Sequence, residues 1–430
     1  MSYVAVIAIM ADFTQYTPLM WFSKKRIYLD YASAPPVLSE AIRRMREVES
    51  LVGNPGAIHA EGVTAKKCLD DSRKRIAELL GCKAREIVFT SGLTEANNLA
   101  ILGFARELST RLNLVEQGST LCSLKGTHWI VSSIEHDSVL ECFAEIERMG
   151  GSVSHVEPDE RGLILPESVL VALRLETVFV SVGWANNEIG IVQPLAKIVR
   201  TLRDFEEKQG RPVVFHTDAG QAPLYLPTLI NSLGVDLLSL GGNKLYGPHG
   251  IGALYLSSRV ALAPVVVGGK QERGLRAGTE SAALAAGFAA AFEVVAKERR
   301  SETERLQKLR DDLAREIVAR IPGTIVNGAL DHALPHMLNV SIPDISSEYV
   351  TLALDSAGIA VSTKSACREG EERMSHVVLA LGDAKNAAPS VALAKEERAS
   401  NTIRFSLGRE TTMANVRNVA SVLCEVIKRT

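Results

Sequence analysis

Short apolar runs alternate with amphipathic stretches along most of this chain. Most of the runs are rich in Leu or β-branched residues and lack a strict polar–apolar alternation, which is typical of strands buried on both faces. Alternating strands and helices imply an α/β layer architecture with a largely parallel sheet, which binds ligands at the carboxyl ends of its strands. Strands are predicted at 86–90, 129–133, 178–182, 213–217, 237–240 and 251–256, and helices at 94–106, 137–149 and 195–208.

The pattern changes towards both ends of the chain. Residues 292–320 are highly charged and predict one helix with a solvated face, which links two domains. Residues 383–399 have no strong pattern and look like a mobile insertion. The apolar stretch 3–10 is far shorter than the roughly 20 residues of a membrane span, and no basic region precedes it as in a signal peptide. The first 26 residues are therefore expected to be a dispensable extension or the product of an upstream start codon.

Composition narrows the class of protein. A length of 430 residues fits one large domain and one smaller domain. The net charge of -2, without a Lys/Arg run, gives no sign of a nucleic-acid or membrane partner. The cysteines are scattered and form no CxxC pair, which argues against a disulfide framework and favours a reducing cytosol. They are Cys68, Cys82, Cys122, Cys142, Cys367 and Cys424.

Lys244 follows a predicted buried strand and lies in a turn rich in glycine and proline, NKLYGPHGIG. Solvated lysines usually lie on helix faces. A lysine held out of water loses its charge more easily, which allows its amine to form a Schiff base. The alternative interpretation is a lysine that pairs with a carboxylate at a turn.

The segment VVFHTDAGQ predicts a strand that ends at Asp218, with Gln221 three residues later. Pyridoxal phosphate (PLP), a cofactor carried by a lysine, works as an electron sink only while its pyridine nitrogen stays protonated, and a carboxylate keeps it so. Asp218 could fill that role, and Gln221 could donate to the phenolic oxygen of the ring. On its own, an aspartate at a strand end is more often a helix N-cap.

Three further loops after predicted strands carry polar side chains. In FTSGLTEANN, a helix start with free backbone N–H groups and the Thr94 hydroxyl suits a phosphate, although an ordinary Ser/Thr cap is the commoner explanation of such a loop. His136 could stack on a flat aromatic cofactor or move a proton, whereas a lone histidine is more often a satisfied turn residue. Asn187, in WANNEIG, offers an amide to the same ligand.

Cys367 lies in a segment of small and polar residues, STKSACREGEE, which predicts an exposed loop. Lys364 and Arg368 favour its thiolate, while three nearby glutamates oppose this, so a modest lowering of the thiol pKa is expected. The alternative is an incidental surface thiol.

In their order along the chain these motifs resemble those of cysteine desulfurases of the NifS/IscS type, within the fold-type I PLP enzymes that are class-V aminotransferase-like. The resemblance runs from Ile27 to about Arg409. Any one motif is weak, whereas the ordered set is highly specific. The segments that carry it are IYLDYASAPP, GNPGAIH, TSGLTEANNLAI, NNEIG, DAGQ, NKLYGPHGIGALY, LRAGTES, SAC and TIRFSLGR.

The resemblance implies an α/β, fold-type I architecture, in which a mainly parallel seven-stranded sheet lies between helices and a smaller α+β domain is attached. Residues 38–290 would form the large PLP-binding domain. Residues 27–37 and 291–430 would form the small domain with the cysteine loop, after the extension 1–26. A homodimer is expected, since Thr279 in LRAGTES would reach the phosphate of the other subunit's cofactor, and the scattered cysteines favour a cytoplasmic location.

The resemblance also implies a role for each candidate residue. Lys244 would carry PLP, Cys367 would receive the sulfur as a persulfide, and His136 would be a third catalytic residue. Arg404, together with Asn187, would bind the substrate carboxylate, for which a guanidinium fork is suited. None of these candidate residues is expected to bind a metal ion. The residues expected to hold the cofactor are Lys244, Asp218 at the pyridine nitrogen, Gln221 and Asn187 at the phenolic oxygen, His136 on the ring, and Leu93, Thr94, Gly241, Gly242, Asn243 and the partner's Thr279 at the phosphate.

The chain differs from the usual family pattern at several positions. Asn243 replaces the histidine that usually precedes the lysine, and Trp184 and Ala185 replace a His-Val pair before NNEIG. The segment after Cys367 is unusually charged. The chain ends at Thr430, sooner after TIRFSLGR than in members that dock an iron–sulfur scaffold. A sulfur-acceptor protein is therefore expected, while docking to such a scaffold stays open.

The predicted function is cysteine desulfuration, in which L-cysteine becomes L-alanine. The sulfur passes through Cys367 to iron–sulfur clusters, other sulfur-containing cofactors or tRNA. Selenocysteine lyases share this machinery and are the first alternative. An aminotransferase or β-lyase would not need Cys367. A non-catalytic sulfur-relay or assembly subunit would not need an intact Lys244 and Asp218.

Overall fold

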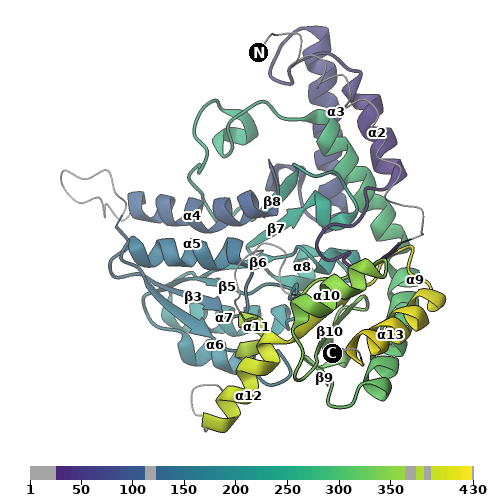
Figure 1. Ribbon diagram of the computed structural model, residues 1–430. Coiled ribbons are helices and arrows are strands. Elements are labelled where there is room, and N and C mark those ends of the chain that lie inside the picture. Colours follow the sequence, from purple (N-terminus) through teal and green to yellow (C-terminus); the bar gives the residue numbers. More distant parts are fainter. Residues whose placement is uncertain (1–25, 112–122, 364–373, 382–388, 429–430) are drawn as a thin grey trace, which may run out of the picture.

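The computed structural model describes residues 26–111, 123–363, 374–381 and 389–428. Its centre is a seven-stranded sheet, in which β8 runs antiparallel to both of its neighbours and the other pairs are parallel (Figure 1). From one edge to the other the strands are β2 (Ile87–Thr90), β8 (Gly252–Leu256), β7 (Leu237–Gly241), β6 (Val214–Asp218), β5 (Thr177–Ser181), β3 (His128–Ser132) and β4 (Ser152–Val156). This confirms the predicted α/β fold with a mainly parallel seven-stranded sheet.

The six predicted strands lie within one residue of their observed ends. The edge strand β4 was not predicted, because its sequence SVSHV holds no apolar run and most of its side chains are exposed or half-buried. Strand prediction from apolar runs therefore succeeds for the buried centre of the sheet and fails at this edge.

Helices cover both faces of the sheet. In β3, Trp129 packs in one hydrophobic core with Leu99 of α4 and Phe143 of α5, while the neighbouring Ile130 packs in the other core with Ile198 of α7. Successive strand residues point to opposite faces, so each strand contributes to both cores. The helices α4 (Leu93–Arg111) and α5 (Asp137–Arg148) cover one face, and α6 (Pro166–Ala172), α7 (Leu195–Gln209) and α8 (Ile230–Leu233) the other (Figure 1).

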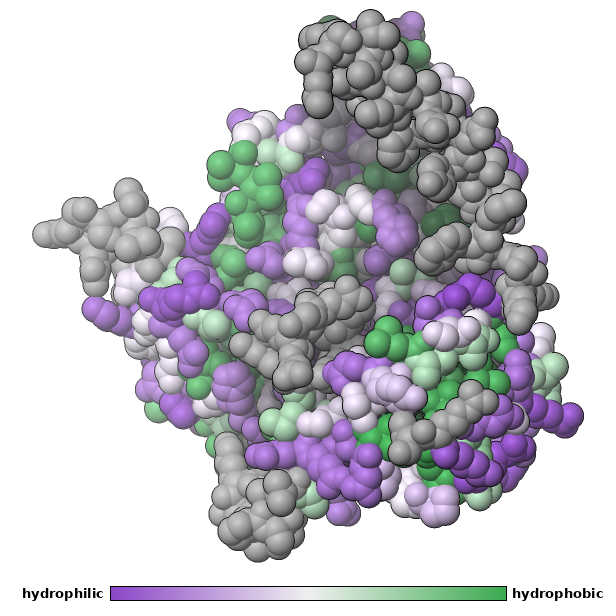
Figure 2. All heavy atoms as spheres, in the orientation of Figure 1, coloured by the Kyte–Doolittle hydropathy of each residue, from purple (hydrophilic) through white to green (hydrophobic). Residues whose placement is uncertain are grey.

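The remaining elements are organised around the long helix α9 (Ala282–Arg320), which runs from α2 and α3 at one end to α13 at the other (Figure 1). A three-stranded antiparallel sheet, β12-β10-β9, and a two-stranded parallel sheet, β1-β11, lie beside it. Hydrophobic residues gather on the visible surface over α10 and α13 (Figure 2). The bounds are α2 (Ser39–Glu49), α3 (Ala60–Leu80), β1 (Ile27–Tyr28), β9 (Ile325–Val326), β10 (Met337–Ser341), α10 (Ser347–Ser356), β11 (Ile359–Ala360), α11 (His376–Ala380), α12 (Pro389–Ser400), β12 (Thr402–Ser406) and α13 (Met413–Ile427), with 3-10 helices η2 (Ala84–Glu86), η3 (Ala222–Leu224), η4 (Gly242–Leu245), η5 (Gln271–Gly274) and η6 (Leu330–His332).

Two predictions about the second half of the chain need correction. Helix α9 begins at Ala282 instead of residue 292, because its Ala-rich first turns are buried and lack the polar face on which the prediction relied. Ser281 caps this start by accepting the backbone N–H of Leu284. In the segment 383–399, predicted as a mobile insertion, residues 389–399 belong to helix α12, whose charged residues give it no strong amphipathic pattern, while residues 383–388 lie outside the described residues.

None of the described helices is both long enough and apolar enough to cross a lipid bilayer.

Candidate active site

A pocket of about 410 Å³ lies at the carboxyl ends of the central strands, where an α/β sheet is expected to bind its ligand. Its walls come from the loops after β2, β3, β5 and β6 and from η4 after β7. Ala32 and Ser33, before α2, and Arg404 of β12 complete the wall. The predicted site residues that line the pocket are Leu93, Thr94, His136, Asn187, Asp218, Gln221, Asn243, Lys244 and Arg404.

Lys244 lies in η4, directly after β7. Its Nζ donates to the carbonyl oxygens of Ala32 and Ser33, at 2.9 and 2.7 Å. A glycine is required two residues before the lysine, because a Cβ on Gly242 would lie 2.7 Å from the side chain of Ile251. The amine is therefore held at the pocket by the segment before α2, and not on a solvated helix face.

Asp218 is the last residue of β6. Its Oδ1 accepts the backbone N–H of Gly220 at 2.8 Å, and its Oδ2 accepts a hydrogen bond from Nδ2 of Asn97 at 2.7 Å. The helix that follows, η3, has Gln221 and not Asp218 as its N-cap residue. The two hydrogen bonds fix the orientation of the Asp218 carboxylate at the pocket wall.

Gln221 has a buried side-chain oxygen without a partner in the described part of the chain. Its Nε2 donates to the carbonyl oxygen of Ala32 at 2.9 Å, whereas its Oε1 is buried and accepts no hydrogen bond. Buried polar atoms are nearly always paired in native proteins. The pocket wall at Gln221 is therefore built for a polar ligand.

Arg404 is held in place by three groups from distant parts of the sequence. Its two terminal nitrogens donate to the Asn187 carbonyl oxygen at 2.8 Å, to Asp30 Oδ1 at 2.7 Å and to Ser33 Oγ at 2.6 Å. Its Nε is buried and has no partner among the described residues. The guanidinium is only 2% exposed, so its charge acts in a largely water-free part of the wall.

His136 is both the N-cap of α5 and part of the pocket wall. Its Nδ1 accepts the backbone N–H of Ser138 at 3.1 Å and lies 2.9 Å from the Ser138 hydroxyl oxygen. Because Nδ1 acts as an acceptor, the ring proton of neutral His136 is on Nε2. The local explanation, a satisfied turn histidine, and the position at the pocket are therefore both correct.

The loop before α4 meets the turn after β7 at one end of the pocket. A Cβ on Gly241 would lie 3.1 Å from Leu93 Cβ and 3.0 Å from Asn243 Oδ1, so these two residues face each other across a glycine. Helix α4 begins at Leu93, and the first backbone N–H groups of a helix have no partner within the helix. Thr94 and Asn243 add side-chain polar groups at the same place.

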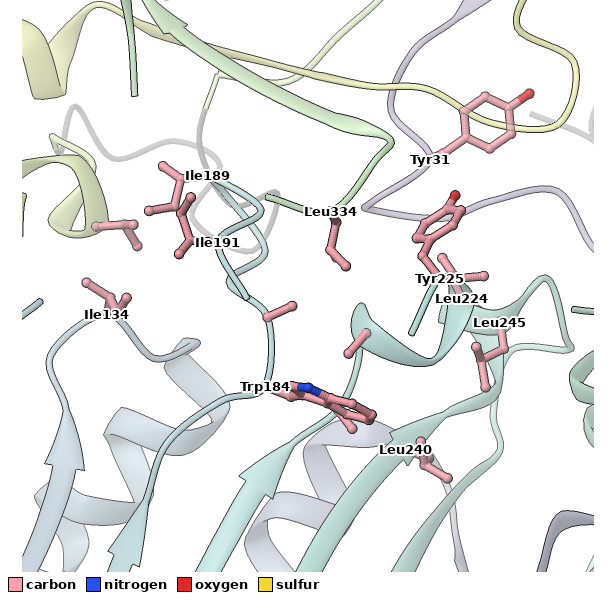
Figure 3. Close-up of a cluster of buried hydrophobic side chains, with 14 of the residues drawn as sticks. Tyr31, Ile134, Trp184, Ile189, Ile191, Leu224, Tyr225, Leu240, Leu245 and Leu334 are labelled. Carbon is pink, nitrogen blue, oxygen red and sulfur yellow. The ribbon is translucent and has the colours of Figure 1, made fainter. Parts of the chain in front are cut away.

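Trp184, in place of the usual histidine, is buried at the ends of the strands (Figure 3). Its indole belongs to the same hydrophobic core as Leu240 and Leu245, and its backbone N–H donates to the Asp218 carbonyl oxygen at 2.9 Å. This residue therefore packs in the core next to the pocket-lining Gly183 and Ala185, and its backbone ties the loop after β5 to Asp218.

Four predicted site residues are not among those that line the pocket. Gly241 and Gly242 lie in the chain directly before Asn243 but do not line the wall themselves. Thr279 is exposed and lies outside the pocket wall of its own chain. Cys367 lies outside the described residues, with its neighbours Lys364 and Arg368. The roles given to Thr279 and Cys367 therefore remain predictions.

Glu135 lines the pocket and was missed by the sequence analysis. Its Oε1 accepts the backbone N–H of Gly183 at 2.7 Å. Burial, reinforced by the negative charge of Asp218, raises the pKa of Glu135 to about 7. Near neutral pH the Glu135 carboxyl is therefore partly protonated, in the same pocket wall as Asp218 and His136. The sequence signal was its position directly before His136 at the end of a predicted strand.

This raised pKa predicts a pH-dependent stability of the cofactor-free protein. Between pH 4.5 and 7 folded Glu135 keeps a proton that the unfolded chain has lost, so the free energy of unfolding falls as pH rises through this range. The loss amounts to about 3 kcal/mol on the linkage scale of about 1.4 kcal/mol per pKa unit. In Glu135→Gln this fall should be absent. The measurement is urea unfolding of both proteins at pH 5 and at pH 8, which gives the free energy of unfolding at each pH.

Glu141→Gln, an exposed change on α5, is the matched control and should keep the wild-type pH dependence. Equal losses of stability between pH 5 and pH 8 in wild type and Glu135→Gln would show that Glu135 titrates normally.

The chain was compared with known proteins. The family described as Aminotransferase class-V matches residues 27–419. The cysteine desulfurase IscS of Dictyoglomus turgidum is 36% identical over 407 residues, which cover 94% of this chain and 95% of the relative. The cysteine desulfurase IscS of Histophilus somni strain 2336 is 38% identical over 412 residues, 94% of either chain.

Solved structures agree over a similar span. A NifS-like protein superposes with a TM-score of 0.81 at 28% identity, covering 94% of this chain and all of that one. The structure titled SspA in complex with cysteine has a TM-score of 0.72 at 32% identity, covering 89% of this chain and 99% of its own. The match of the family over most of the sequence, and of relatives over nearly their whole length, shows that this chain belongs to the class-V aminotransferase family.

Proposed function

We propose that this protein is a PLP-dependent cysteine desulfurase, which converts L-cysteine to L-alanine and transfers the sulfur to Cys367 as a persulfide. The observation that carries the proposal is the single pocket shared by Lys244, Asp218 and Arg404, in a chain whose relatives at 36–38% identity are cysteine desulfurases. Those relatives match over nearly their whole length, which supports the same activity for the whole chain.

The residues of the pocket fit PLP. A lysine, a carboxylate and a helix start whose first N–H groups have no partner within the helix match the aldehyde, the pyridine nitrogen and the phosphate of the cofactor. When bound, PLP supplies an electron sink for negative charge that develops on the substrate. In this proposal Lys244 carries the cofactor, and the other contacts are those expected from the sequence: Asp218, Gln221, Asn187, His136, Leu93, Thr94, Gly241, Gly242, Asn243 and the partner's Thr279.

Arg404 and Asn187 bind the substrate in this proposal. A guanidinium has a fork of donors that matches a carboxylate, and Arg404 already holds one carboxylate, that of Asp30. Its Nε has no partner among the described residues and is a further donor, which the carboxylate of cysteine reaches only when the wall around this buried atom opens. Arg404 therefore orients the amino acid with its side chain free to react.

Lys244 and Cys367 carry out the chemistry in this proposal. The Lys244 amine takes a proton from the Cα of the substrate. The thiolate of Cys367 then attacks the substrate sulfur: an S–S bond forms, and the Cβ–S bond breaks with its electron pair on carbon. That carbon takes up a proton, which replaces the one lost from the substrate thiol, and becomes a methyl group. The Lys244 ammonium returns the first proton to Cα. The products are alanine and Cys367 as a persulfide.

The setting of the reaction follows from the same proposal. The protein acts as a cytoplasmic homodimer, in which the partner's Thr279 completes the phosphate site. The persulfide sulfur passes to an acceptor protein and serves iron–sulfur cluster assembly. The large domain spans residues 38–290, and the small domain combines residues 27–37 and 291–430.

The activity is tested by incubating the PLP-loaded protein with L-cysteine and a thiol reductant. Alanine and sulfide should appear in equal amounts, because each turnover makes one alanine and the reductant releases one persulfide sulfur. Pyruvate in place of alanine would identify a β-lyase, and the absence of both products would favour a non-catalytic subunit. A parallel assay with selenocysteine compares the two substrates.

A further inference from the structure

A chain of hydrogen bonds lies behind the pocket wall and joins three separate elements. Asn97 of α4 donates from Nδ2 to Asp218 Oδ2 at 2.7 Å and to Ser138 Oγ at 2.9 Å. The Ser138 hydroxyl in turn lies 2.9 Å from His136 Nδ1. Asp218 and His136 line the pocket, whereas Asn97 is fully buried and does not. Asn97 is therefore the point at which these two pocket residues are connected.

In this chain of hydrogen bonds, each group acts either as donor or as acceptor in a way that the contacts determine. An amide nitrogen carries two hydrogens, and Asn97 uses both, one for a carboxylate that can only accept and one for Ser138. His136 Nδ1 accepts the backbone N–H of Ser138, so it is unprotonated and accepts the Ser138 hydroxyl hydrogen as well. The Asn97 amide is therefore one of the two groups that orient the Asp218 carboxylate, and it reaches the His136 ring through the Ser138 hydroxyl.

The other half of the Asn97 side chain supports the same conclusion. Its Oδ1 is buried and has no hydrogen-bond partner among the described residues. An unpaired buried carbonyl oxygen is unfavourable for folding, and turning the amide over would place that oxygen against the Asp218 carboxylate. Packing alone therefore does not explain an asparagine here, whereas its two donated hydrogen bonds do.

We propose that Asn97 is a positioning residue, which holds the Asp218 carboxylate and the His136 ring in a fixed relation so that both meet the same PLP ring. The proposal rests on the function given above. Asn97 does not touch the ring, so its effect is expected in how firmly and in which orientation PLP is held. Turnover should fall through kcat more than through KM.

The test compares PLP binding to Asn97→Asp, Asn97→Ala and wild type at pH 6 and pH 8.5. At pH 8.5 the introduced carboxyl of Asn97→Asp repels Asp218, and PLP should bind about tenfold more weakly. At pH 6 that carboxyl takes up a proton more readily beside another carboxylate, can donate to Asp218, and should recover most of the affinity. Asn97→Ala should bind PLP weakly at both pH values. Circular dichroism in the cofactor absorption band should weaken in parallel.

Asn98→Asp is the matched control, since it adds the same charge one residue further along α4, where the side chain donates to the Thr94 carbonyl oxygen of its own helix at 2.9 Å and not to Asp218. It should follow the wild-type pH dependence. The proposal would be overturned if the PLP affinity of Asn97→Asp depended on pH in the same way as that of Asn98→Asp. The comparison of these two variants decides the matter even if Asn97→Ala does not fold. If PLP binding in the wild type and the variants followed these expectations but the wild-type protein formed no alanine from cysteine, the proposed function would be contradicted and the role of Asn97 in holding PLP would stand.

Discussion

Lys244→Ala is expected to abolish desulfuration of cysteine and covalent attachment of PLP. The substitution removes the amine that Ala32 and Ser33 hold at the pocket, and with it the proposed proton transfer at Cα, so the rate should fall by about 10³-fold or more. Borohydride treatment followed by peptide mass spectrometry should find PLP on the peptide that contains Lys244 in wild type, and on no peptide in the variant.

The matched control is Lys197→Ala, an exposed lysine on α7 that is outside the pocket. It should keep the PLP-labelled Lys244 peptide and the wild-type rate. Lys244→Ala protein that still carried borohydride-trapped PLP at its active site would assign the cofactor to another lysine. Free PLP bound without a covalent link would agree with the prediction, because the remaining contacts are unchanged.

The sequence located much of this pocket because a parallel sheet places the ends of its strands side by side. Asp218 ends a buried strand and Lys244 follows another. The apolar sequence of these strands was therefore enough to predict that both residues lie at the same edge of the sheet. The same logic applied to His136 and Asn187, whose loops follow β3 and β5. Residues that end strands could therefore be assigned to one site from local pattern alone.

Glu135 and Asn97 could not be found in this way, because their importance depends on partners far along the chain. Gly183, which donates to Glu135, is 48 residues away, and Asp218 is 121 residues from Asn97. Asn97 lies inside a helix, where a polar residue usually indicates a solvated face. Only the packing of α4 against the end of β6 turns it inwards.

Elements without a periodic pattern were the other source of error. The start of α9 is buried and Ala-rich, so its sequence has no polar face to mark a helix, and β4 is an edge strand without an apolar run. Neither error affected the site, because both elements lie away from the strand ends that line the pocket.

Cys367→Ser is expected to bind PLP and cysteine like wild type, yet to release almost no alanine, with a loss of at least about 100-fold. A serine hydroxyl cannot take up the substrate sulfur, because it is a much weaker nucleophile than a thiolate near neutral pH. Wild-type protein treated with cysteine should carry added sulfur on the peptide that contains Cys367. Absorption spectra with cysteine, alanine assays and peptide mass spectrometry together measure these three effects.

The other described cysteines are poor substitutes for Cys367. Burial raises the pKa of Cys142 and of Cys82 to about 12, so neither forms a useful fraction of thiolate at neutral pH. The sequence around the five cysteines other than Cys367 predicts helices or strands for them, which is wrong for Cys82, because it lies in the turn after α3. Cys68 and Cys424 are half-buried on helices. None of these thiols lines the pocket.

Cys424→Ser is the matched control, because it makes the same change on α13 and should leave both alanine release and the sulfur-labelled peptide unchanged. Desulfuration by Cys367→Ser at the wild-type rate would show that sulfur leaves the substrate without this thiol, and a simple β-lyase would then be the better description. Added sulfur on a different cysteine would keep the desulfurase chemistry but move the acceptor. Since burial suppresses the thiolates of Cys82 and Cys142, we expect the label on Cys367.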